Sequence, residues 1–234
     1  MPSQNVTPRY RHEVLATAFR VGPTDDGVQS LQVLAWLRER DPYAGRWALP
    51  SGPVLPEETM EQCLRRTLAA KVDLGHVAHT EQLDTRSEPG RDPYERTIAT
   101  AYLALVPSDE DPGLPAHAAW WPVDALPVMA FDHADVVAAA VRRLRNKLSY
   151  TNLGFALAPP SFTIAQLRQI YRAALDHDLD ATNLQRVLQR RGQLEPTGRT
   201  VPAGPNGGRP AAEFRFTRRV AEVTDPFAVL RGPA

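Results

Sequence analysis

The chain has 234 residues, of which 43% are hydrophobic and 23% charged, with 22 prolines and 14 glycines. This composition is ordinary for a globular protein and excludes wholesale disorder, and no apolar run is long enough to span a membrane. A single cysteine, Cys63, excludes an internal disulfide framework and a multi-cysteine zinc site. The first residues are polar and lack a signal-peptide core, so we expect a cytoplasmic protein of one large or two small domains.

The net charge of zero hides an asymmetry along the chain. Residues 1–160 contain 16 Lys+Arg and 20 Asp+Glu, a net charge of −4, whereas residues 161–234 contain 11 and 7, a net charge of +4. Within residues 186–219, eight arginines stand against Glu195 and Glu213. Unless this split arose by chance, it predicts an acidic or neutral body with a basic appendage for an anionic partner.

The first 150 residues have the pattern of a mixed α/β domain. Apolar residues at 60, 64 and 68 recur every four, which predicts a helix from Glu57 to about Val72, after Pro56. A second helix is expected from Phe131 to Leu148, with Val136, Val137, Val141, Leu144 and Leu148 on its buried side. We expect strand character at residues 14–21, 31–37, 47–52, 79–85, 97–106 and 120–123.

A proline pair, Pro159-Pro160, separates this body from a second, shorter unit. Thr163-x-x-Gln166 is a capping-box pattern that opens a helix ending near Leu175. A second helix is expected at 181–191, ended by Gly192, and a hairpin at 194–201 and 211–217. Helix, turn, helix and hairpin are typical of a winged helix-turn-helix.

Gly52, Glu58 and Arg66 are spaced as G-x5-E-x7-R within SGPVLPEETMEQCLRRTLAAKVDLG. This pattern resembles the Nudix box, in which glutamates that follow the arginine share one helical face and hold a divalent metal against a diphosphate. Several carboxylates are needed there, because Mg²⁺ prefers hard oxygen ligands and its charge must be balanced.

The glutamate positions of the box are occupied here by Thr67, Ala70 and Lys71, which would share one helical face. Alanine offers no ligand, and Lys71 places a cation where the metal would sit. Glu57, Glu58 and Glu61 lie earlier in the segment, and Glu58 is open to three interpretations: a helix-start charge, an Arg66 partner or a ligand. We therefore expect no metal, no catalytic residues and no Nudix hydrolysis.

A degenerate Nudix domain joined to a winged helix resembles the Nudix-related transcriptional regulators of NAD metabolism. The C-terminal segments FTIAQLRQIYRAALDHDLDATNLQRVLQRRGQLEPTG and GGRPAAEFRF carry this resemblance, which spans about residues 11–216. It implies an α/β (α+β) Nudix-type sandwich at residues 1–158 and a winged helix-turn-helix at 159–234. It also implies a homodimeric repressor of NAD synthesis or salvage genes, bound to a double-stranded DNA operator and released by ADP-ribose or a related nucleotide effector, with no other cofactor.

The second helix of the winged unit is the candidate recognition helix. Asp180 can cap it, and Asn183, Arg186 and Arg190 share one face. Arginine suits guanine and asparagine suits adenine in the major groove, although a solvated polar face is the alternative. The candidate DNA-contacting residues are Thr182, Asn183, Arg186, Gln189 and Arg190 on the helix, and Arg199, Thr200 and Arg209 beside the wing loop.

Candidate effector residues cluster around the loop SEPGRDPYER. Arginines can hold a diphosphate bidentately, and a carboxylate can accept hydrogen bonds from ribose hydroxyls. A solvated loop with internal Arg–Asp pairs is the alternative. The loop candidates are Arg86, Arg91, Asp92 and Arg96, and analogy with the family's binding site adds Arg46 and Arg66.

Two other functions compete with the repressor. One is an active Nudix hydrolase with an accessory basic domain, and loss of the carboxylate face argues against it. The other is a module that recruits a protein partner through the winged helix, and the arginine-rich recognition helix argues against that.

Overall fold

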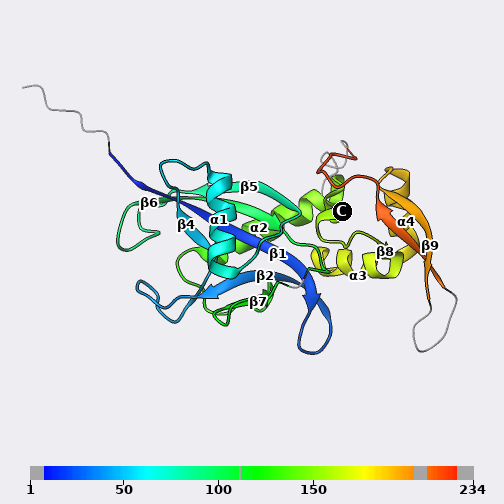
Figure 1. Ribbon diagram of the computed structural model, residues 1–234, viewed down its shortest axis with the longest axis horizontal. Coiled ribbons are helices and arrows are strands. Elements are labelled where there is room, and N and C mark those ends of the chain that lie inside the picture. The colour runs from blue at the N-terminus through cyan, green and yellow to red at the C-terminus, as the bar shows by residue number, and fades with distance from the viewer. Residues whose placement is uncertain (1–7, 111, 203–209, 226–234) are drawn as a thin grey trace, which may run out of the picture.

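A mixed sheet of seven strands forms the first part of the computed structural model, which describes residues 8–110, 112–202 and 210–225 (Figure 1). The central strand β1 pairs in parallel with β6 and antiparallel with β2 and β4. The outer strands β5, β7 and β3 pair antiparallel with β6 and β2. The strands are β1 (Arg11–Pro23), β2 (Gln29–Leu37), β3 (Trp47–Ala48), β4 (Ser51–Pro53), β5 (His79–Arg86), β6 (Thr97–Leu105) and β7 (Ala118–Pro122).

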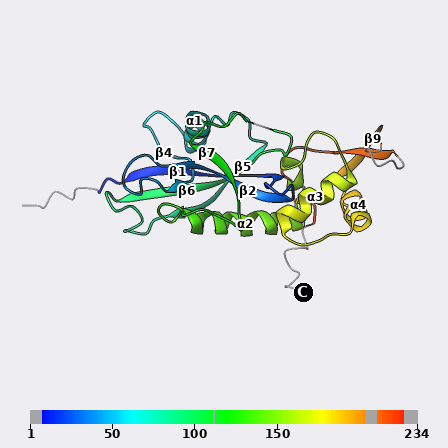
Figure 2. The ribbon, with the colours of Figure 1, turned by 90° about the horizontal axis from the view of Figure 1, so that it is seen from below.

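Helices α1 (Met60–Val72) and α2 (His133–Tyr150) cover opposite faces of this sheet (Figure 2). Alternate residues of β1 point to opposite faces. Val14, Ala16 and Ala18 are therefore buried with Leu64 and Leu68 of α1. Leu15, Phe19 and Val21 are buried with apolar residues of α2 such as Val136, Val137 and Leu144. The resulting α–β–α sandwich is the expected fold.

The start of α1 differs from the prediction. The helix was expected to open at Glu57, but it begins at Met60, after the N-cap Thr59. The Thr59 side chain accepts a hydrogen bond from Gln62 N, and the Gln62 side chain accepts one from Thr59 N, which completes a capping box. The capping box satisfies backbone N–H groups at the start of the helix with local side chains. Glu58 therefore lies before the helix, where its carboxylate binds Arg66.

The second part has the predicted helix-turn-helix and hairpin, at one end of the long axis (Figure 1). Helix α3 opens at the Thr163–Gln166 capping box, and the Asp180 side chain caps α4 through Asn183 N. A third strand, β8, pairs with β10 and was not predicted. The elements are a short 3-10 helix (Leu153–Ala156), β8 (Phe162–Thr163), α3 (Ile164–Leu175), α4 (Ala181–Arg190), β9 (Leu194–Val201) and β10 (Ala211–Phe216).

The junction between the two parts is packed rather than extended. All eight residues from 151 to 158 are buried, and one apolar cluster runs from α2 through Phe155 to Leu167 and Leu184. The predicted domain boundary, between residues 158 and 159, lies at the end of this buried segment. No helix in residues 8–110, 112–202 and 210–225 is long and apolar enough to cross a membrane.

Candidate functional sites

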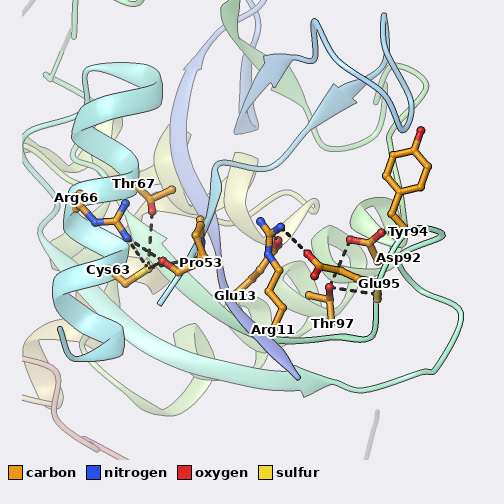
Figure 3. A network of polar contacts seen from close by, with 11 residues as sticks. Arg11, Glu13, Pro53, Cys63, Arg66, Thr67, Asp92, Tyr94, Glu95 and Thr97 are labelled. Carbon is orange, nitrogen blue, oxygen red and sulfur yellow. Dashed lines mark hydrogen bonds and ion pairs between the residues drawn. The ribbon is translucent and has the colours of Figure 1, made fainter. Parts of the chain in front are cut away.

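A cavity of about 320 Å³ opens beside the Nudix-like segment, between β1, β4 and α1. Figure 3 shows Arg66 and Thr67 of α1 on one side, Asp92, Tyr94 and Glu95 on the other, and Arg11 and Glu13 of β1 between them. The charged lining residues are Arg11, Glu13, Arg38, Asp41, Arg66, Lys71, Asp92 and Glu95. Four cations and four carboxylates therefore face a polar cavity large enough for a small ligand.

Three residues of the Nudix-like pattern fix one wall of this cavity. A Cβ atom on Gly52 would lie 2.7 Å from Thr67 Oγ1, so only glycine lets β4 approach α1 this closely. Arg66 binds Glu58 bidentately, with Nη2–Oε1 at 2.5 Å and Nε–Oε2 at 2.9 Å. Arg66 Nη2 also donates to Pro53 O at 2.9 Å. The guanidinium holds the pKa of Glu58 down at about 2, so Glu58 acts as the partner of Arg66.

Lys71 and Arg38 differ from the other cations of the cavity. Arg11 pairs with Glu13 and Glu95, and Arg66 pairs with Glu58. Over the described stretches of the chain, neither Lys71 nor Arg38 forms an ion pair with a carboxylate. Both instead lie over the Trp36 ring, with Lys71 Nζ 4.3 Å and Arg38 Cζ 5.9 Å from its centroid.

Burial perturbs both of these groups. Desolvation lowers the pKa of Lys71 to about 8, and it also lowers the pKa of Arg38. Arg38 donates from Nε to Pro42 O at 2.9 Å and lies 4.9 Å from the Phe131 ring centroid. Two half-buried cations without carboxylate partners thus line one cavity, an arrangement that disfavours the empty state and favours an anion.

A divalent metal, which active Nudix domains use, does not fit these residues. Thr67 is packed against Gly52, Ala70 has no donor atom and Lys71 is cationic. Three of the four lining carboxylates are engaged elsewhere: Glu13 and Glu95 bind Arg11, and Asp92 accepts from Tyr94 N and Thr97 Oγ1. The fourth, Asp41, does not by itself supply the several oxygen ligands that such an ion needs. Among the residues that the structure describes, no three His, Cys, Asp or Glu side chains are grouped to hold a metal ion.

The predicted effector residues are divided between the cavity and the rest of the domain. Arg66 and Asp92 line the cavity, whereas four arginines are not among its lining residues. Arg91 is buried against Asp132 at 2.8 Å, Arg86 pairs with Asp84, Arg96 lies over Tyr10, and Arg46 lies over Tyr43. Arg86 and Arg91 do pair with aspartates, but both partners, Asp84 and Asp132, lie outside the loop and Arg91 is buried, so the alternative of a solvated loop with internal pairs does not describe them either.

Sequence reasoning missed Arg11, Glu13 and Arg38 as cavity residues. They come from the start of β1 and the end of β2, and only strand pairing across the sheet brings them to α1. No local motif marks them. Lys71, by contrast, was singled out as a changed position of a known pattern, although not as a ligand contact.

The outer face of α4 carries the predicted recognition residues together. Thr182, Asn183, Arg186, Gln189 and Arg190 are all exposed, whereas Leu184 and Leu188 are buried. Arg186 Nη2 donates to Asn183 Oδ1 at 2.8 Å, so two of these side chains are already oriented toward each other. The helix therefore presents a continuous polar face to solvent, beside the wing.

The wing adds cations with structural anchors. Arg199 and Thr200 are exposed on β9, and Arg199 Nε donates to Glu213 Oε2 of β10 at 2.9 Å. Ser161 and Thr197 hydroxyls also donate to Glu213, each at 2.8 Å. Arg209 lies outside the described residues. Arg215, exposed and paired with Glu195, is a further cation of the hairpin that the prediction did not include.

Both parts of the chain match known protein families. The NUDIX domain family matches residues 15–144, and the NrtR DNA-binding winged helix domain family matches residues 154–216. The chain is 31% identical over 214 residues to the ADPR responsive transcriptional repressor NtrR of Acinetobacter baylyi, a match that covers 88% of this chain and 83% of that relative.

Two solved structures resemble this chain over both of its parts. The crystal structure of Shewanella oneidensis NrtR has a TM-score of 0.74 and 26% identity, covering 88% of this chain and 94% of that one. The crystal structure of the same protein complexed with a 27mer DNA has a TM-score of 0.72 and 25% identity, covering 88% and 93%. The likeness thus includes the way in which the two parts are joined.

Proposed function

Because the chain belongs to the NrtR family, which joins a Nudix domain to an NrtR DNA-binding winged helix domain, we propose that it is a transcriptional repressor of NAD synthesis or salvage genes. It acts in the cytoplasm, binds an operator through the winged helix, and is released when ADP-ribose enters the cavity beside α1. The single observation that carries DNA binding is the exposed polar face of α4, with Arg186 and Arg190, next to a two-stranded hairpin.

DNA contact is assigned to the outer face of α4 and to the wing. The N-terminal part of a recognition helix enters the major groove, and there Arg186 and Asn183 have the donors and acceptors to read base edges. Arg199 and Thr200 on β9 are positioned to contact phosphates or the minor groove. A homodimer would place two such helices on a near-palindromic operator, and sizing of the free and DNA-bound protein tests this arrangement.

The experiment that tests the proposal is an anisotropy titration with duplexes from upstream of the protein's own gene and its neighbours. Arg186→Ala should weaken operator binding by about 1–3 kcal/mol if it reads a base. Arg142→Ala, which removes the same charge from an exposed position on α2, is the matched control and should bind as the wild type does. Equal loss in both variants, or no saturable binding to any duplex at moderate salt, would contradict the proposal.

Nudix hydrolysis is the alternative activity, and the side chains of the cavity argue against it. The wall that would hold the metal presents Thr67, Ala70 and Lys71, so we propose that the domain binds without turnover. Incubation with ADP-ribose and Mg²⁺ should release no more AMP than a buffer control. Mg²⁺-dependent turnover that disappears in Glu58→Gln would make the protein an enzyme.

A further inference from the structure

We propose that Lys71 and Arg38 form a metal-free diphosphate site, in which the Lys71 ammonium takes the place of the divalent cation of active Nudix domains. This inference rests on the proposed function for the identity of the ligand, but not for the existence of the site. It concerns the chemistry by which the cavity holds two neighbouring phosphate groups.

The four cations of the cavity differ in how their charges are balanced. Arg11 and Arg66 are neutralised by Glu13, Glu95 and Glu58. Lys71 and Arg38 are half-buried and, among the described residues, have no carboxylate partner. Asp41 and Asp92 also line the cavity, but among the described residues neither forms an ion pair with Lys71 or Arg38. The charges that act on Lys71 are one carboxylate, Glu13, and three cations, Arg11, Arg38 and Arg66. Because charged groups removed from water are normally paired, the positive charge around Lys71 is available to a ligand.

Lys71 and Arg38 are held at one place in the structure. Both cations contact the same ring, that of Trp36, and both line the same cavity. The Trp36 indole Nε1 donates to Leu49 O at 3.2 Å, which fixes the ring as a platform. An ammonium and a guanidinium that contact one ring and line one cavity suit an anion with two phosphate groups, because guanidinium binds phosphate bidentately and ammonium acts as a point charge.

The side chains on the α1 wall of the cavity do not suit a metal ion. Lys71 occupies a position where a Nudix box has a ligand glutamate, one helical turn after Thr67. A divalent cation would be repelled by Lys71 and would find no carboxylate among the α1 residues that line this wall. The same substitution that removes metal chemistry therefore supplies a fixed positive charge at the same place, and binding becomes independent of metal.

Calorimetry on the full-length protein tests the site with inorganic pyrophosphate as the probe and with ADP-ribose in parallel. Pyrophosphate should bind the wild type in EDTA, and ADP-ribose should bind equally well in EDTA and in excess Mg²⁺. Lys71→Met should weaken both ligands about tenfold or more, since a charge-assisted contact is lost and tenfold corresponds to about 1.4 kcal/mol. Lys71→Arg, which keeps the charge, should retain most of the affinity.

Arg65→Met, on the exposed side of the same helix, is the matched control and should bind like the wild type. Thermal unfolding of each variant separates a lost contact from a lost fold. Pyrophosphate binding without ADP-ribose binding would support the diphosphate site and overturn ADP-ribose as the effector. Binding of either ligand only in the presence of Mg²⁺, no pyrophosphate binding at all, or unchanged affinity in Lys71→Met would overturn the inference.

Discussion

Burial of the Lys71 ammonium beside Trp36 lowers its pKa to about 8, so this side chain destabilises the ligand-free protein. The unfolded chain keeps the lysine protonated up to its ordinary pKa of 10.5, whereas the folded protein releases the proton near 8. Between these values the unfolded state binds more protons, so the free energy of unfolding rises with pH. A residue retained at such a cost is typical of a binding site.

We predict that Lys71→Met raises the free energy of unfolding of the ligand-free protein at pH 7 by about 1 kcal/mol, the gain from removing a desolvated charge less the lost contact with the indole ring. Denaturant unfolding at pH 7 and pH 10 measures this, and the advantage of the variant should shrink at the higher pH. A variant less stable than the wild type at both pH values would contradict the argument. The charged and titratable groups around Lys71 are Arg11, Glu13, Arg38, Asp41, Arg66, Asp92, Glu95 and His117.

Individual site residues could be predicted only where a pattern or an exposed helical face marks them. Gly52, Glu58 and Arg66 form the predicted group because their spacing places them on one strand–loop–helix unit. The face of α4 follows from helical periodicity alone. Arg38 and Arg11 could not be found this way, because their place in the cavity depends on pairing between strands distant in sequence.

Helix α2 begins at a buried histidine that links it to the sheet. His133 Nδ1 accepts a hydrogen bond from Leu49 N at 3.0 Å, so the ring is held as the neutral tautomer. Complete burial lowers the pKa of His133 to about 3. Asp132, immediately before the helix, forms an ion pair with Arg91 at 2.8 Å. These contacts fix the start of α2 close to Phe131, which lines the cavity.

We predict that the free energy of unfolding falls as the pH drops below about 6.5, by about 1.4 kcal/mol per pH unit from His133 alone. The unfolded chain binds this proton and the folded protein does not until the pH nears 3. His133→Asn keeps an acceptor for Leu49 N and removes the titration, so its stability should depend less on pH between 4.5 and 6.5. Equal pH dependence in both proteins, measured by denaturant unfolding, would assign the acid sensitivity to other groups.

Residues 217–225 connect the end of α2 to α4, the proposed recognition helix. Thr151 forms an isolated antiparallel β-bridge with Val223, and Asn152 N donates a hydrogen bond to Glu222 O. Arg191, the C-cap of α4, binds Asp225 Oδ2 at 2.7 Å and Ser149 O at 2.9 Å. This segment lies beyond the winged-helix match, which ends at 216, and it connects the two elements that must move together if the cavity is to influence α4.

We predict that Asp225→Ala reduces the effect of ADP-ribose on operator binding, because it loosens the contact between α4 and the end of α2. Operator affinity without effector should stay within about twofold of wild type, while the ratio of affinities with and without ADP-ribose falls toward one. Glu222→Ala is the control, since its side chain pairs with the exposed Arg218. An unchanged ratio in Asp225→Ala would show that the segment does not transmit the signal.

The helices of the winged unit were predicted closely, and its shortest strand was not. The bounds of α3 and α4 follow from the Thr163 and Asp180 caps, which act within one helical turn. Strand β8 has two residues and exists because Phe162 pairs with Phe214, more than fifty positions away. A segment this short carries no periodicity of its own.

Across the whole molecule, the cavity and the recognition helix lie at opposite ends of a continuous packed structure. Helix α2 has 18 residues and spans about 27 Å, from His133, two residues after the cavity-lining Phe131, to Tyr150. Its buried face belongs to the same apolar cluster as Leu167 and Leu184. An effector bound in the cavity, as proposed, would therefore act next to an element that is packed against the DNA-binding part through the buried residues 151–158.

An effector shifts such an equilibrium only by its differential affinity for the DNA-competent and DNA-incompetent states. We predict a coupling of about 1–3 kcal/mol, so that saturating ADP-ribose weakens operator binding about 5- to 150-fold. Linkage then requires the operator to weaken ADP-ribose binding by the same factor. Calorimetric titration of ADP-ribose with and without operator measures this, with NAD and AMP alongside.

In this scheme Lys71 and Arg38 hold the ligand and not the DNA. The Lys71→Met variant should therefore bind the operator normally and stay bound at ADP-ribose concentrations that release the wild type. Equal ADP-ribose affinities with and without operator would show that the cavity does not control the recognition helix.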